Sequence, residues 1–261
     1  MTMDNETQAR IRPRFHRLAE QVADHLRHRI LVGELADGSL LPKEAELRAE
    51  YPVSKPSIRE AMRILEAEGL VTVRRGKHGG AVVHRPSPAN VAYTLSLVLA
   101  SERVAVTDVA AALKELEPAC AAFCALRPDR ATEVVPELRR LHEEATAELD
   151  DLVGITTASR RYHEALVQLC GNFTLSTMTG ALEALWSAHE SSWASRVSDH
   201  GQIPLEERTR VLRDHERLID AIEAGDAALA RRLAAEHLEE SQQYPGDVGL
   251  VDPDLFRDQQ S

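Results

Sequence analysis

The chain has 261 residues, of which 43% are hydrophobic and 28% charged, a balance typical of a globular protein with one large or two ordinary domains. The longest apolar run, which starts near Val91, is too short to span a bilayer, and the N-terminal residues lack the apolar stretch of a secretory signal. Cys120, Cys124 and Cys170 are an odd number without a disulfide spacing, so reduced thiols are expected. We therefore expect a cytoplasmic protein with no membrane partner.

The formal net charge is −11, which by itself argues against binding to nucleic acid. The charge is unevenly distributed, because residues 1–85 carry 15 Lys and Arg against 12 Asp and Glu, whereas the remaining residues carry 16 against 30. This pattern indicates a small basic module joined to an acidic body. Any contact with DNA is therefore expected in the first module.

The first module is predicted to contain three helices and a hairpin. Residues 15–32 have the apolar spacing of a helix, and residues 41–51 predict a second, shorter one. A third helix is predicted over residues 54–68. Residues 70–85 then alternate like a strand, turn through a tip rich in glycine and lysine, and return as a strand. This order predicts a winged helix-turn-helix.

The third helix has a clear start and two distinct faces. Ser54 is a good N-cap, and Pro56 costs little in a first turn, where the backbone N–H groups have no intrahelical partner. An apolar stripe with helical spacing is expected to face the core; it consists of Ile58, Ala61, Met62 and Leu65. A basic face lies elsewhere on the helix, with Lys55, Arg59 and Arg63 every four residues and Ser57 beside them. Such a helix fits a major groove, although a solvated basic face is the usual interpretation of an isolated helix.

The stretch GELADGSLLPKEAELRAEYPVSKPSIREAMRILEAEGLVTVRRGKHGGAVV resembles the DNA-binding domain of the GntR family, and the likeness covers about residues 15–85. The resemblance implies that the DNA contacts come from the third helix and the wing tip, at Ser54, Lys55, Ser57, Arg59, Arg63, Arg75, Gly76 and Lys77. Two positions depart from the family pattern. Lys55 stands where arginine is usual, and Ala45 stands where some members carry a basic residue, so the operator sequence is expected to differ.

The rest of the chain is predicted to be an all-α bundle. After a linker at 86–89, helices are expected near 90–101, 107–126, 130–149, 155–170, 174–198, 205–224 and 226–243. The predicted domains are thus the winged helix-turn-helix at 15–85 and a helical effector-binding and dimerisation domain at 90–243. Residues 1–14 are expected to form a flexible tail, and residues 244–261 a loose one.

Three histidines of the second domain are candidate metal ligands. His215 and His237 lie on adjacent predicted helices, and imidazoles from facing helices can bind zinc or a similar divalent ion. Taken one at a time, each is more often a packed or surface histidine. The segment resembles the FCD ligand-binding domain of the FadR subgroup, and this likeness adds His163 to the set.

The FCD resemblance implies a metal held by these histidines and a cavity for a small organic acid. Ser159 replaces the aspartate that ligates the metal in the family, and Leu113 stands where many members carry an arginine near the ligand's carboxylate. His189 and Arg160 are the candidate effector contacts. The alternative for His189 is a partly exposed helical histidine, and the alternative for Arg160 is a solvated side chain.

Together these features predict a ligand-responsive transcription regulator that is not an enzyme: a homodimeric repressor bound to a near-palindromic DNA operator. A metallohydrolase is one alternative, but the H-E-x-x-H pattern is absent, since Val167 and Ile219 stand where its second histidine would be. An architectural DNA protein without a ligand is another. The size and acidity of the second domain argue against it.

Overall fold

The computed structural model describes residues 14–74, 80–197, 204–242 and 249–255. The chain divides into two compact units between Pro86 and Ser87, close to the predicted linker at 86–89. Part of that linker is helical, because α4 (Pro88–Ser101) begins inside it. The side chain of Asn90 accepts a hydrogen bond from the backbone N–H of Ser87 (2.9 Å), and proline is well tolerated in a first turn.

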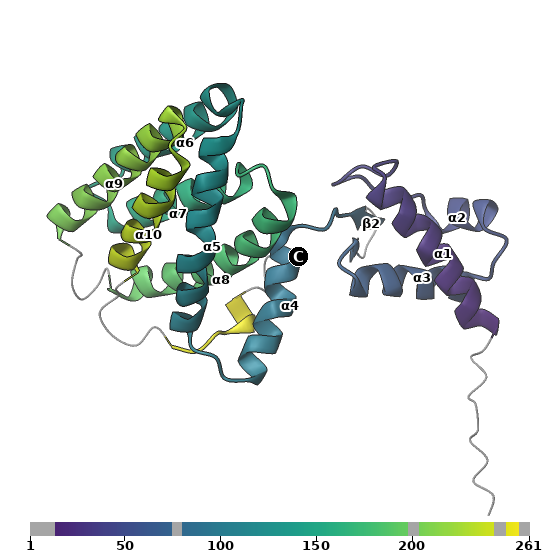
Figure 1. The fold of residues 1–261 in the computed structure, drawn as a ribbon. Coiled ribbons are helices and arrows are strands. Elements are labelled where there is room, and N and C mark those ends of the chain that lie inside the picture. The colour runs from purple at the N-terminus through teal and green to yellow at the C-terminus, as the bar shows by residue number, and fades with distance from the viewer. Residues whose placement is uncertain (1–13, 75–79, 198–203, 243–248, 256–261) are drawn as a thin grey trace, which may run out of the picture. The chain divides into compact units, whose positions relative to one another are not determined.

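The first unit confirms the predicted helices (Figure 1). They are α1 (Arg14–Leu31), α2 (Glu44–Glu50) and α3 (Lys55–Ala67). Ser54 caps α3, since its Oγ accepts from the backbone N–H of Ser57 (3.4 Å), and Pro56 lies in the first turn as expected. The buried residues of α3 meet α1 and the wing in one apolar core that contains Leu26, Leu47, Ile58, Ala61, Leu65 and Val71.

The wing is a two-stranded antiparallel sheet of β1 (Val71–Arg74) and β2 (Gly80–Val83), in which Val71 pairs with Val83. Leu40 adds a single bridge to Val82 on the other side of β2. The predicted DNA contacts at the wing tip, Arg75, Gly76 and Lys77, lie outside the described residues.

The second unit is all-α in its described part (Figure 1). After α4 come α5 (Val106–Leu126), α6 (Val135–Ala147), α7 (Leu152–Gln168), α8 (Phe173–Val197), α9 (Leu205–Ala224) and α10 (Ala227–Ser241). The helix α5 packs against α7, α8, α9 and α10, so it lies at the centre of the bundle. None of the helices in the described ranges is both long and apolar enough to cross a membrane.

In the second unit, two helix starts differ from the sequence-based prediction by three residues or more. The helix expected over 130–149 opens instead with a π-helical turn, η1 (Arg130–Val134), and α6 starts only at Val135, with a proline in its first turn. The next helix, α7, begins three residues earlier than predicted, because Asp151 caps it by accepting from the backbone N–H of Val153 (3.1 Å).

The C-terminal segment differs more. Residues 249–255 were expected within a loose tail, but Val251 is 4% exposed and packs in a core with residues of α4, α5 and α8. The backbone N–H of Val251 donates to the carbonyl of Val104 (3.0 Å), and that of Val106 donates to the carbonyl of Gly249 (3.0 Å). This segment, residues 249–255, is therefore part of the second unit. We call it the C-terminal strap.

Candidate functional site

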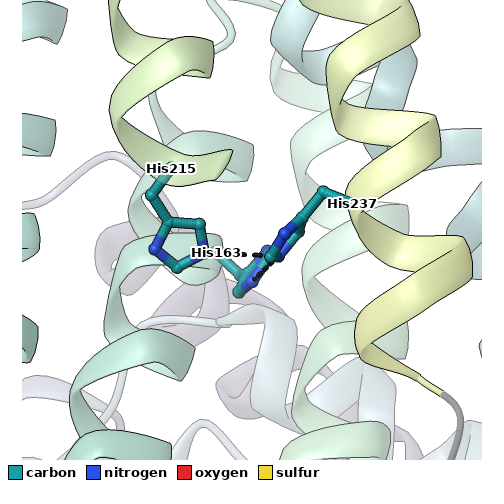
Figure 2. Close-up of side chains that lie close together, drawn as sticks. All are labelled: His163, His215 and His237. Carbon is teal, nitrogen blue, oxygen red and sulfur yellow. Dashed lines mark hydrogen bonds between the residues drawn. The ribbon is translucent and has the colours of Figure 1, made fainter. Parts of the chain in front are cut away.

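His163, His215 and His237 meet in the interior of the second unit, from α7, α9 and α10 (Figure 2). The Nε2 atom of His237 lies 3.3 Å from that of His163 and 3.2 Å from that of His215. One nitrogen from each ring falls within 4.8 Å of the others. The three predicted ligands are thus brought together.

Local structure explains this convergence. Gly225 ends α9 with a positive φ (+73°), and Asp226 caps α10 through the backbone N–H of Leu229 (2.9 Å), so the two helices that carry His215 and His237 pack side by side. Tyr162 supports the site from α7. Its ring stacks on His215 with centroids 4.0 Å apart, and its hydroxyl donates to the His215 carbonyl (3.4 Å).

The surroundings keep the imidazoles neutral. Burial lowers the pKa of His215 and of His237 well below the usual range, and the neighbouring histidines lower them further. Burial also lowers the pKa of His163, and the nearby Glu183 carboxylate offsets part of this shift. A neutral imidazole is the form that binds a metal ion, so the site is electrostatically prepared for one.

Two buried acids adjoin the histidines and were not singled out from the sequence. Glu117 on α5 is 1% exposed, and its Oε1 lies 2.6 Å from Nδ1 of His163. With the His163 proton on Nδ1, the lone pair of Nε2 faces the other two rings. Burial raises the pKa of Glu117 to about 7, while burial and the Glu117 carboxylate raise that of Glu183 well above its usual range. A signal was present, because Glu117 interrupts the core-facing stripe of α5 between Leu113 and Ala121.

The helix α3, which the sequence predicts to be the recognition helix that enters a major groove, presents its basic residues to solvent. Side-chain exposure is 51% for Lys55, 65% for Arg59 and 77% for Arg63. The predicted DNA contact of Ser57 stays a prediction, and its surroundings give it a second role. It is 2% exposed, and its hydroxyl is hydrogen-bonded to that of Ser54 (2.9 Å), so it forms part of the helix cap.

Comparison with known proteins decides the family. Bacterial regulatory proteins of the gntR family match residues 18–82, and the FCD domain matches residues 108–240. The chain belongs to the GntR family, in the subgroup with an FCD domain.

Two named relatives and one solved structure are consistent with this family. An Escherichia coli (strain K12) protein, provisionally named the L-lactate dehydrogenase operon regulatory protein, is 32% identical over 85% of this chain and 84% of its own length. The galactonate operon transcriptional repressor of the same strain is 30% identical over 82% of this chain and 91% of its own. The solved structure of a Streptococcus agalactiae GntR has a TM-score of 0.65 at 21% identity, covering 86% and 99% of the two chains, and supports the fold alone.

As a GntR regulator, the chain is a DNA-binding transcription factor and not an enzyme. Its histidine site fits a divalent ion. Three nitrogens that bind zinc tetrahedrally at 2.0–2.1 Å stand about 3.3 to 3.4 Å apart, close to the two separations of 3.2 and 3.3 Å. Nδ1 of His215 is buried without a hydrogen-bond partner. Among the described residues no carboxylate joins this group of ligands, in line with the serine at position 159.

The two candidate effector contacts of this GntR regulator have different surroundings. His189 has both ring nitrogens engaged: Nδ1 donates to the Leu185 carbonyl (2.7 Å), and Nε2 accepts from the backbone N–H of Asp252 (3.0 Å). It therefore holds the C-terminal strap, and its role in effector binding stays a prediction. Arg160 donates through Nη1 to the Ser187 carbonyl (2.5 Å) and to the Ser191 hydroxyl, while its buried Nε has no hydrogen-bond partner.

Proposed function

We propose that this GntR regulator is a homodimeric repressor that a small organic acid releases from DNA, and that a divalent metal ion at His163, His215 and His237 takes part in binding that acid. The convergence of three neutral imidazoles, with nitrogens at metal-ligand spacing, is the observation that carries this function. The galactonate operon relative is itself a repressor, which supports the direction of regulation. Because the regulator of this proposal acts on DNA, we expect it in the cytoplasm.

The donor set determines what a metal would contribute here. When bound, a divalent ion supplies positive charge and an open coordination position for an effector oxygen. Nε2 of each histidine would hold it. Glu117 fixes the ring and tautomer of His163 through the 2.6 Å contact to Nδ1, as carboxylates commonly do behind metal-bound histidines.

An organic acid also needs a cationic partner in the protein. Leu113 is fully buried at the position where many FCD domains carry arginine, so this position offers no charge. Arg160 takes over that role in our proposal, because the N–H at its Nε is buried and free to donate. An unsatisfied buried donor is costly, and an effector carboxylate would satisfy it.

Repression requires a coupling between the two units. In our proposal two copies of α3 read the half-sites of a near-palindromic operator, since the symmetry of a dimer is mirrored in its DNA. The effector changes DNA affinity only if it binds the DNA-free and DNA-bound arrangements with different affinity. The linkage is reciprocal, so operator DNA should weaken effector binding by the same factor.

The test begins with the metal. Purified full-length protein should contain about one zinc or similar ion per chain after dialysis against the metal, and its melting temperature should fall when a chelator removes it. His215→Ala should abolish both effects, whereas the matched control His189→Ala should keep the metal. If wild-type protein retains no metal and melts identically with zinc and with chelator, the metal part of the proposal is wrong.

The effector is tested on the same preparations. A calorimetric screen of small organic acids should find one that binds wild type, and this acid should release DNA that the protein has selected from a random pool. Arg160→Ala should weaken binding of the acid at least tenfold, or about 1.4 kcal/mol. Failure of every acid to bind would contradict the effector class, and unchanged affinity in the variant would contradict the role of Arg160.

A further inference from the structure

Glu44, the first residue of α2, contacts two of the exposed cations of the recognition helix. Its Oε1 lies 3.0 Å from Nζ of Lys55, and its Oε2 lies 3.3 Å from Nε of Arg59. Both oxygens of one carboxylate are therefore engaged, each by a different basic side chain. Lys55 and Arg59 are one helical turn apart, so a single acid on the preceding helix links them.

The place of this contact along α3 matters. In a helix-turn-helix, the N-terminal residues of the recognition helix are those that reach the base edges. Lys55 and Arg59 belong to that end of α3. Arg63, one turn further on, pairs only with Glu60 of its own helix among the described residues, at 3.4 Å. The carboxylate from α2 thus acts where bases are read.

Glu44 is poorly explained as a stabiliser of the fold. The side chains of Glu44, Lys55 and Arg59 are 35%, 51% and 65% exposed, and ion pairs at such exposure contribute little to stability. A negative charge beside the reading face also repels the phosphate backbone, so it lowers affinity for DNA of any sequence. What the contact does provide is a fixed direction for two long side chains that would otherwise sample many rotamers.

We propose that Glu44 is a positioning residue of the DNA-reading surface: it orients Lys55 and Arg59 toward base edges and thereby sets sequence selectivity. Phosphate contacts require only charge, whereas a base contact requires a donor in a defined direction. Loss of the carboxylate should therefore favour binding to any DNA and reduce the preference for the correct site. The inference rests on α3 being the reading helix.

The experiment uses full-length wild type, Glu44→Gln and the control Glu60→Gln. DNA selected by wild type from a random pool supplies the specific probe, and a shuffled duplex of equal length supplies the non-specific one. Affinity for both is measured at fixed salt, together with the melting temperature of each protein. Glu60→Gln is matched to Glu44→Gln because it removes the same charge, here beside Arg63 in the middle of the helix.

We expect Glu44→Gln to bind the shuffled duplex at least as tightly as wild type and to lose about tenfold in the ratio of specific to non-specific affinity. Selection repeated with this variant should give relaxed base preferences. Glu60→Gln should tighten binding to both duplexes and keep the ratio.

Three results would overturn the inference. The first is an unchanged ratio in Glu44→Gln, and the second is an equal loss of ratio in Glu60→Gln, which would show a general effect of charge. The third is a loss of ratio that merely follows a lower melting temperature. If wild type itself enriches no sequence, the assignment of α3 as a reading helix fails together with the inference, and the wild-type selection alone shows it.

Discussion

Single residues around the three histidines determine how this regulator departs from its family. Ser159 lies one helical turn before His163 on α7 and is half-buried, at the position where the FCD resemblance implies a metal-binding aspartate. A serine hydroxyl is a poorer ligand for a divalent ion than a carboxylate. Two buried acids, Glu117 and Glu183, lie behind the ligands and not among them, and burial raises the pKa of both, which favours their neutral forms.

Restoring the aspartate should therefore strengthen the site. Ser159→Asp adds an anionic ligand one turn from His163, and we expect zinc affinity to rise about tenfold, or about 1.4 kcal/mol. Zinc titration by calorimetry, with wild type and His215→Ala as references, measures the change. If the histidines are merely packed, the new carboxylate is buried without a partner, and the variant melts lower with zinc and with chelator alike.

The pKa shift of His215 predicts how stability depends on pH. Because its pKa is lowered in the folded state, the unfolded chain takes up a proton below about 6.5 that the folded chain resists. In chelator, the melting temperature of wild type should therefore fall relative to that of His215→Ala as the pH is lowered from 7.5 to 5.5. A difference between the two proteins that stays constant over this range would contradict the burial of a neutral imidazole.

Residue types along the sequence predicted much of this site but not its surroundings. The three histidines were found because their spacing matched a family pattern, and the structure brings them together. Glu117 could have been inferred from its place in an apolar stripe. The role of His189 in holding the strap could not be inferred, because its partner is the backbone of residue 252, and a contact across 63 positions leaves no local pattern.

At the scale of elements, the cap of α3 holds the basic residues of the recognition helix in place. Ser54→Ala removes the acceptor for the backbone N–H of Ser57, and we expect the free energy of unfolding of residues 1–86 to fall by about 1 kcal/mol. DNA binding should weaken in parallel, because the first turn carries Lys55. Urea denaturation measures the first effect. Ser39→Ala is the control, because it removes a hydroxyl that donates to the Ala36 carbonyl (2.6 Å) outside any helix cap, so it should leave DNA binding unchanged.

The C-terminal strap is the element that the sequence predicted least well. Residues 244–261 have no helical period, and Val251, the buried apolar side chain among the described residues 249–255, gives no signal by itself. The backbone bonds that place the strap join it to residues 104–106, far away in the sequence. Helices such as α9 and α10 were predicted closely, because a local apolar period and the glycine between them carry their signal.

The strap should contribute measurably to the stability of the second unit. Val251→Ala removes a side chain that is 4% exposed, and we expect a loss of about 2 kcal/mol. Leu250→Ala is the matched control, because the neighbouring side chain is 46% exposed and its truncation should cost little. Urea denaturation of the full chain followed by helical circular dichroism compares the two. Equal effects of both variants would show that the strap does not pack as described.

For the whole molecule, the division between residues 86 and 87 separates two units with different cores and different charge. The first unit has its own apolar core around α1, α2, α3 and the wing, and the second has separate cores built from its helices and the strap. The two parts also differ in charge, because the excess of basic residues lies in 1–85 and the large acidic excess lies after it. We therefore assign DNA contact to the first unit and, in our proposal, effector binding to the second, and we expect each unit to fold alone.

Dimerisation is expected to reside in the second unit. Several large apolar side chains of that unit are exposed in the single chain, among them Leu97, Val98, Leu126, Phe173 and Met178. We expect residues 87–261 alone to form a dimer in light scattering at micromolar concentration and residues 1–86 alone to be monomeric. In a dimer, the second DNA-binding unit contacts its half-site as part of the same complex. Residues 1–86 alone lose this link, so we expect them to bind the operator about 10² to 10⁴ times more weakly than the full chain. If residues 87–261 are monomeric, the dimer contact lies elsewhere. If residues 1–86 bind the operator as tightly as the full chain, DNA binding does not require a dimer.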